Sequence, residues 1–143
     1  MKYSISVTIN KDLAYVLKEF QNKETAFKWI EGLKELNLIE GEENKEGSKY
    51  EMVFESKGKT QKMIETLEKI ELPNSITTRY QMGKVNNLCI NKFSESSGQS
   101  IYTMDTTFVF PFPQNILMML FKSLFKMETK KGMIAFKNYI ESL

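Results

Sequence analysis

The strongest constraint on the fold lies between Ile101 and Leu143. Residues 101–110 alternate between apolar and polar side chains with a period of two, as in a half-buried strand. Pro111 and Pro113 then end the ladder, because proline has no backbone N–H to donate. A Met- and Phe-rich amphipathic stretch follows and predicts a long terminal helix. A helix covering a sheet indicates an apolar interior, which is either a solid core or a ligand cavity.

The predicted terminal helix covers residues 114–141. At 1.5 Å per residue it would run roughly 40 Å, enough to cross a small domain. Gly132 lies inside it and costs ~1 kcal/mol relative to alanine. We therefore expect a local kink or fraying between Thr129 and Gly132.

The N-terminal part predicts one strand and two short helices. Residues 3–9 alternate as a half-buried strand, and Asn10 or Asp12 can cap a helix that ends at Phe20. A second short helix is expected from Asn22, with Gly32 near its end.

Six further strands are predicted from a period of two and recurring turn signals. They lie near residues 36–44, 48–56, 60–71, 75–83, 86–95 and 100–110. Short connections make the sheet predominantly antiparallel, and no repeat or linker divides residues 1–143, so we expect one domain. Along Gln61–Ile70 the apolar residues switch between odd-numbered and even-numbered positions, and so between the two faces of the strand. This change of parity indicates a bulge or bend and therefore a curved sheet.

Composition excludes several functional classes. The formal net charge is only +2 and Arg79 is the one arginine, which argues against nucleic-acid binding. The chain has no histidine and a single cysteine, Cys89, so neither the familiar zinc sites nor an intramolecular disulfide can form, and we expect no metal or other cofactor. No apolar run approaches the ~20 residues of a membrane span, and the N-terminus lacks a secretory signal; we expect a cytoplasmic protein without stable membrane insertion.

Several segments, in this order, resemble the START-like SRPBCC superfamily, specifically its polyketide cyclase/dehydrase and lipid-transport branch. The resemblance covers essentially the whole chain. Five segments carry it. They are the opening strand Ser4–Ile9, which is followed by a small helix, the phenylalanine-to-tryptophan segment Ala26–Gly32, the entry to the third strand at Gly47–Tyr50, the strand before a proline at Glu65–Pro73, and the closing pattern Gly132–Ser142.

This resemblance implies a helix-grip fold of the α+β class. In that fold a curved seven-stranded antiparallel sheet, with two short helices after the first strand, packs against a long C-terminal helix. The superfamily includes lipid and sterol carriers, aromatic polyketide cyclases, plant hormone receptors and co-chaperones. It therefore implies a tendency to bind hydrophobic molecules and does not imply one reaction.

Candidate ligand-binding residues lie on the expected concave face, the short helices and the terminal helix. They are Trp29, Tyr50, Met52, Phe54, Thr78, Tyr80, Tyr102, Met104, Thr106, Phe108, Leu117, Phe121 and Leu124. Core filling explains the apolar members about equally well, and the polar members either orient a ligand head group or hydrogen-bond to one another. The helix stripe of Met118, Met119, Phe121, Phe125 and Met127 is wider than a buried seam needs, which favours cavity lining or a partner surface.

We expect a non-catalytic protein that binds or carries a small hydrophobic molecule, such as a lipid, a polyketide-like compound or an aromatic compound. Two alternatives stay open at this point. One is a cyclase/dehydratase-type enzyme acting on a polyketide-like substrate, although neither Asp105 nor Glu65 has an acid–base partner at a recognisable spacing. The other is a protein-interaction module that uses the C-terminal helix, including a homodimer.

Overall fold

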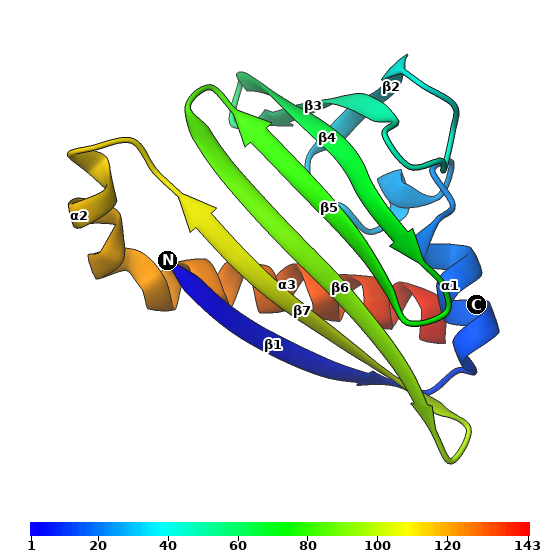
Figure 1. Ribbon diagram of the computed structural model, residues 1–143. Helices are drawn as coiled ribbons and strands as arrows, with labels where there is room; N and C mark the ends of the chain where they lie inside the picture. The colour runs from blue at the N-terminus through cyan, green and yellow to red at the C-terminus, as the bar shows by residue number, and fades with distance from the viewer.

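A computed structural model describes residues 1–143 and shows one seven-stranded antiparallel sheet with a long helix across one face (Figure 1). The strand order is β1-β7-β6-β5-β4-β3-β2. This arrangement confirms the predicted α+β helix-grip fold. The strands are β1 Lys2–Ile9, β2 Leu33–Glu40, β3 Lys49–Ser56, β4 Lys59–Glu71, β5 Ser75–Met82, β6 Val85–Ser96 and β7 Gln99–Val109, and the α-helices are α1 Leu13–Phe20, α2 Gln114–Met118 and α3 Lys122–Glu141.

The sheet curves around α3, and one source of the curvature is visible in β4. The pairing of β4 with β5 shifts register between Leu67 and Lys69. An extra residue in one strand of an antiparallel pair bends that strand and increases its twist. The parity change predicted for this segment is therefore confirmed as a bulge.

The main core lies where α3 and α1 meet the strands at the sheet edge that contains β1. Met133, Phe136 and Ile140 of α3 are fully buried, and they pack against a cluster that includes Val7, Ile9, Val16, Leu17, Phe93 and Tyr102. Asp12 caps α1, because its carboxylate accepts a hydrogen bond of 2.8 Å from the Tyr15 amide. The helix predicted to end at Phe20 is thereby confirmed.

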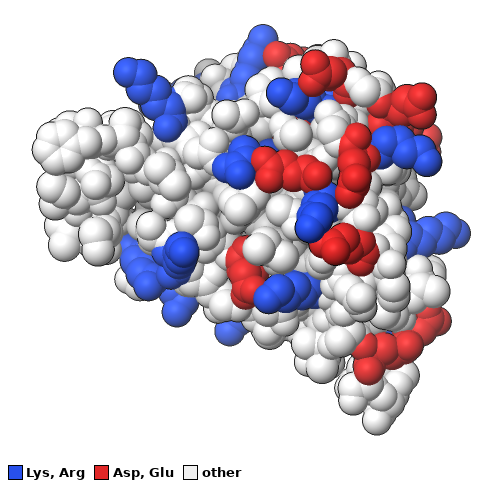
Figure 2. Space-filling view, in the orientation of Figure 1, with Lys and Arg blue, Asp and Glu red and all other residues white.

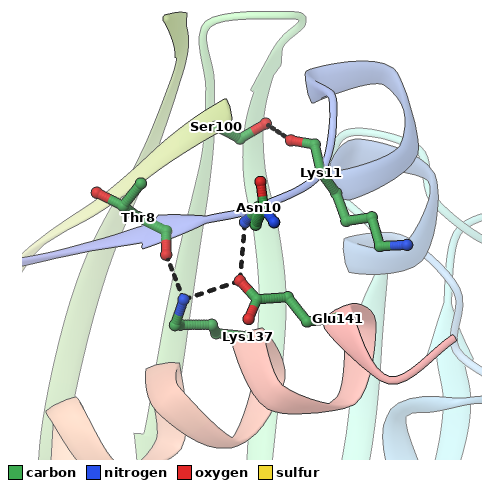
Figure 3. A network of polar contacts seen from close by, with 6 residues as sticks. All are labelled: Thr8, Asn10, Lys11, Ser100, Lys137 and Glu141. Atoms are coloured by element: carbon green, nitrogen blue, oxygen red, sulfur yellow. Dashed lines mark hydrogen bonds and ion pairs between the residues drawn. The ribbon is translucent and has the colours of Figure 1, made fainter. Parts of the chain in front are cut away.

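A polar network fixes the last turns of α3 to the end of β1 (Figure 3). Lys137 Nζ donates to the Thr8 carbonyl at 2.7 Å and pairs with the Glu141 carboxylate at 2.8 Å. The Asn10 amide donates to the same Glu141 oxygen at 2.8 Å. These bonds hold the C-terminal end of α3 in place while its other half extends along the sheet.

The second predicted short helix is wrong in extent. Only a 3₁₀ turn forms, at Ala26–Lys28, and Leu33 already begins β2. Gly32 explains the early end: its φ of +78° reverses the chain, and its carbonyl accepts a hydrogen bond of 2.9 Å from the Glu55 amide. The chain therefore joins the sheet where the sequence pattern still suggested a helix.

The terminal helix is broken at a different place from the one predicted. A 3₁₀ turn at Met119–Phe121 separates α2 from α3, whereas Gly132 lies within the continuous α3. No residue of α2 is buried, so no tertiary packing extends that helix. Around Gly132, by contrast, the packing of Met133 and Phe136 holds α3 together. None of the helices combines the length and the apolar character needed to cross a membrane.

Candidate ligand-binding cavity

A cavity of about 620 Å³ lies between the concave face of the sheet and α3. Seventeen of its 22 lining residues are hydrophobic, and Glu128 is the only charged one. The lining consists of Phe20, Trp29, Ile30, Met52, Phe54, Met63, Tyr80, Met82, Val85, Asn87, Cys89, Asn91, Tyr102, Met104, Phe108, Phe110, Phe125, Glu128, Thr129, Gly132, Met133 and Phe136. Cavities of this size and composition are typical of sites for small apolar ligands.

The closed end of the cavity is aromatic. The rings of Trp29 and Phe136 meet edge to face with centroids 4.8 Å apart, and Phe20 contacts Phe136 in the same manner at 5.6 Å. Tyr102 stacks on Phe93 at 5.1 Å. Such ring pairs add stabilisation beyond simple burial, so the side chains at this end hold one another in place.

Several polar side chains of the cavity wall hydrogen-bond within the protein, either to one another or to Thr106, which lies outside the lining. The Tyr102 hydroxyl donates to Asn91 Oδ1 at 2.8 Å, and Asn91 Nδ2 donates to the Ile76 carbonyl at 3.1 Å. Asn87 Nδ2 donates to Thr106 Oγ1 at 2.7 Å. Mutual hydrogen bonding, one of the two interpretations open from the sequence, therefore describes the predicted residues Tyr102 and Thr106.

The titratable hydroxyls and the thiol of the cavity stay protonated at neutral pH. Burial raises the pKa of Tyr80 well above its ordinary value, and the nearby Glu65 carboxylate raises it further. Burial also raises the pKa of Tyr102 and of the Cys89 thiol. Protonated groups of this kind are poorly suited to removing a proton.

A buried ion pair lies beside the cavity rather than in its wall. Glu65 is buried, and its carboxylate is 2.8 Å from Lys23 Nζ. Lys23 Nζ also lies 4.5 Å from the centre of the Tyr50 ring. Glu65 is in register with Tyr80 on β5, so this pair borders the polar side of the cavity wall.

The opposite end of the cavity lies at the turn between β5 and β6. Met82 and Val85 flank the turn between β5 and β6, and Met82 is 39% exposed. Phe110 follows β7, and its ring lies 5.6 Å from that of Phe125 on α3. Near this end, the Tyr3 hydroxyl donates to the Phe125 carbonyl at 3.2 Å and lies 2.7 Å from Thr129 Oγ1, which attaches α3 to β1.

The predicted site residues fall into three groups. Seven line the cavity: Trp29, Met52, Phe54, Tyr80, Tyr102, Met104 and Phe108. Three are buried outside its lining: Tyr50, Thr78 and Thr106. The Tyr50 hydroxyl accepts a hydrogen bond of 2.9 Å from the Asn44 amide, which is a structural role. The other three are exposed on the surface and do not line the cavity: Leu117, Phe121 and Leu124.

The helix residues were misplaced because none of them lies on the face of α3 that lines the cavity. Leu117 is in α2 and Phe121 is in the 3₁₀ turn, whereas Leu124 is in α3 but about 100° around the axis from Phe125. The face of α3 that lines the cavity carries Phe125, Thr129, Met133 and Phe136, at spacings of three and four residues. A continuous helix from residue 114 would instead present Leu117, Phe121 and Leu124 together. The spacing of Phe125, Met133 and Phe136 was the available signal for the correct face.

The likeness to proteins of known structure concerns the fold. No family model and no curated protein sequence matches the chain. The crystal structure of Ara h 8.0201 aligns with a TM-score of 0.79 at 16% identity, covering 100% of this chain and 99% of the other. A protein of Thermus thermophilus aligns at 0.78 and 12% identity, covering 99% and 98%. The di-domain ARO/CYC StfQ from the steffimycin biosynthetic pathway aligns at 0.77 and 10% identity, covering 99% of this chain and 50% of StfQ.

Proposed function

We propose that the protein binds a small hydrophobic molecule in the cavity between the curved sheet and α3 and carries it without chemical change. The observation that supports this most is the cavity of about 620 Å³, with its largely apolar lining and one charged side chain. Burial yields roughly 25 cal/mol per Å² of apolar surface removed from water, so a ligand burying about 300 Å² would gain some 7 kcal/mol. That is sufficient for binding in the micromolar range before ordering costs are subtracted.

The polar groups of the wall are largely engaged within the protein, which favours a mostly apolar ligand. Tyr80 lines the cavity, and its protonated hydroxyl hydrogen-bonds to the Glu65 carboxylate. Asn91 and Tyr102 already satisfy each other and offer less to a ligand. The ligand class that fits is a lipid, a polyketide-like compound or an aromatic compound with a single polar end.

A cyclase/dehydratase-type enzyme is the second candidate, and the fold likeness to the ARO/CYC StfQ supports it. Such a reaction needs a group that accepts a proton inside the cavity. The tyrosines have raised pKa values, and the buried Glu65 is already paired with Lys23. These observations favour carriage over catalysis.

Two substitutions at one position test the carrier proposal. A Cβ added at Gly132 would meet no atom within 4 Å, and Gly132 lines the cavity. Gly132→Phe should fill the cavity, whereas Gly132→Ala is the matched control that leaves most of the space free. Binding is measured by the fluorescence of N-phenyl-1-naphthylamine, an uncharged apolar probe.

We expect the wild type and Gly132→Ala to bind the probe and Gly132→Phe to lose at least about tenfold in affinity, since a filled cavity no longer removes probe surface from water. Thermal melting checks that each variant is folded. Equal probe affinity in all three proteins would contradict the proposal, and so would a wild type that binds no probe.

A further inference from the structure

The segment between β7 and α3 forms an exposed apolar protrusion, here called the apolar tip and defined as residues 112–121. In Figure 1 it extends away from the sheet at the left, with α2 at its end. Four of its side chains are largely exposed: Phe112 at 80%, Leu120 at 78%, Met119 at 69% and Ile116 at 61%. Soluble proteins rarely expose so many large apolar side chains together unless something covers them.

The charges nearest the apolar tip in the sequence are positive, and Glu128 is the first acidic residue after it. From Val109 to Met127 the chain contains no acidic residue, and its only charged residues are Lys122 and Lys126. In the sheet, Lys2 is opposite Thr107, and Lys84 lies in the turn beside the Asn86–Val109 pair. Figure 2 shows the left end of the molecule white, with blue groups at its base and red and blue groups interspersed over the rest of this face. The base of the apolar tip is therefore positively charged.

The cavity lining reaches the base of the apolar tip. Phe110 lies two residues before it and Phe125 follows it by four residues, and both line the cavity. Phe125 contacts Phe108 and Phe110 with ring centroids 5.1 and 5.6 Å away. An apolar surface therefore leads from the cavity to the protrusion.

We propose that the apolar tip docks onto the surface of an anionic lipid bilayer, with Phe112, Met119 and Leu120 between the head groups. Lys122 and Lys126 then lie at the level of the negatively charged lipids. Interfacial segments bind in this way, through an apolar face a few ångströms deep and lysines that attract anionic lipids. The inference depends on the apolar tip alone and holds whether or not the cavity carries a ligand.

Charge argues against a second copy of this chain as the occupant. A two-fold interface brings the same patch of both copies together. Such an interface would gather Lys122 and Lys126 of both copies, and residues 109–127 provide no acid to neutralise them. A bilayer containing anionic lipid removes the apolar side chains from water and also places negative charges next to the lysines.

The test is sedimentation of the protein with vesicles. We expect binding to phosphatidylcholine vesicles that contain about one third phosphatidylserine, and at least about tenfold weaker binding to pure phosphatidylcholine, since each lysine near an anionic surface contributes to the attraction. Raising the salt concentration should weaken binding to the anionic vesicles.

Matched variants separate the apolar and the charged contributions. Met119→Ser with Leu120→Ser should abolish binding, whereas Ile39→Ser, at a 54% exposed position on β2, should leave it unchanged. Lys122→Glu with Lys126→Glu should weaken binding by at least about tenfold. Lys45→Glu is the control, because Lys45 is exposed in the turn between β2 and β3, away from the apolar tip. All these positions are exposed, so each variant should fold, which circular dichroism verifies.

Three results would overturn the inference. The first is a wild type that does not sediment with anionic vesicles. The second is equal binding by the Met119→Ser, Leu120→Ser double variant and by Ile39→Ser. The third is a wild-type dimer in light scattering that becomes monomeric in the double variant while vesicle binding is absent, which would assign the apolar tip to self-association.

Discussion

The Tyr102 hydroxyl donates a hydrogen bond of 2.8 Å to Asn91 Oδ1 at the closed end of the cavity, and both residues are at most 3% exposed. Asn91 Nδ2 continues the chain of bonds to the Ile76 carbonyl at 3.1 Å. Side chains of β7 and β6 thereby connect to the backbone of β5 beneath the cavity. The polar residues there belong to the scaffold, and the apolar lining is what a ligand would contact.

Removing the Tyr102 hydroxyl should therefore reduce stability. Tyr102→Phe leaves the buried Asn91 oxygen without its donor, and an unsatisfied buried acceptor costs about 1 to 3 kcal/mol. The free energy of unfolding in urea measures this loss. Tyr15→Phe is the control, because the partly exposed Tyr15 packs against Lys11 through its ring, which phenylalanine retains. An unfolding free energy for Tyr102→Phe equal to that of the control would contradict the assignment.

The Lys23–Glu65 pair should show strong coupling. Lys23→Met leaves the buried Glu65 carboxylate without its cation, and breaking a buried pair costs roughly 3 kcal/mol. Combining Lys23→Met with Glu65→Leu should recover much of that loss, because no uncompensated charge remains. Lys49→Met, in the exposed pair with Glu40 at 3.8 Å, should change the unfolding free energy by less than about 1 kcal/mol. Additive effects of the two Lys23 and Glu65 substitutions in urea unfolding would exclude coupling.

Gly132→Ala should stabilise the protein by up to about 1 kcal/mol, since alanine favours a helix and the added Cβ meets no atom within 4 Å. Gly58→Ala provides a contrast of opposite sign. Its Cβ also meets nothing within 4 Å, but Gly58 has φ +76°, so alanine there costs about 1 kcal/mol or more. The melting temperature should therefore rise in Gly132→Ala and fall in Gly58→Ala. A lower melting temperature for Gly132→Ala would mean that its surroundings are less open than described.

The contact between Glu141 and Asn10 should make part of the stability depend on pH. The Asn10 amide, and then Lys137, lower the pKa of the Glu141 carboxyl in the folded protein. A lowered pKa stabilises the fold above the unfolded-state value of about 4.3, and this contribution disappears as the pH falls through the folded-state pKa. Glu141 is 28% exposed, so solvent screening limits the contribution to about 1 kcal/mol.

Comparison of the wild type with Glu141→Gln measures this contribution. The difference in unfolding free energy should be constant between about pH 6 and 7, shrink below about pH 4.3 and vanish in stronger acid. Glu24→Gln, at an exposed position outside the network, serves as the control. A difference that grows as the pH falls would reverse the expected sign.

Most strands could be predicted closely from the sequence because their alternation reflects burial of one face, whereas the strand predicted near 36–44 is β2 at Leu33–Glu40. The predicted strand at 75–83 corresponds to β5 at Ser75–Met82, and the parity change in β4 marked a real bulge. The end of the segment after Asn22 was not predictable in the same way. Gly32 turns the chain into β2 because the sheet provides the Glu55 amide as a partner, which is a contact distant in sequence.

The cavity could be predicted only in part. Residues on strands, such as Met52 and Tyr80, follow from parity, because alternate residues share a face. The helical part failed because Leu117 and Phe121 precede α3, which starts only after the 3₁₀ turn at Met119–Phe121, and because Leu124 lies on a different side of α3 from Phe125. Nothing local marks that turn, since the same residues could continue an amphipathic helix. We attribute the turn to the lack of any part of the protein packed against α2. The periodic pattern of apolar residues does not reveal that lack.

The single cysteine lets the accessibility of this cavity be measured by the rate at which its thiol reacts. Cys89 is the only thiol of the chain, it lines the cavity and it is 4% exposed. A thiol reagent can reach it only by entering the space that a ligand would occupy or by waiting for the protein to open. The rate of modification therefore depends on how often the cavity is empty and accessible. It can be measured in the wild-type chain without introducing a cysteine.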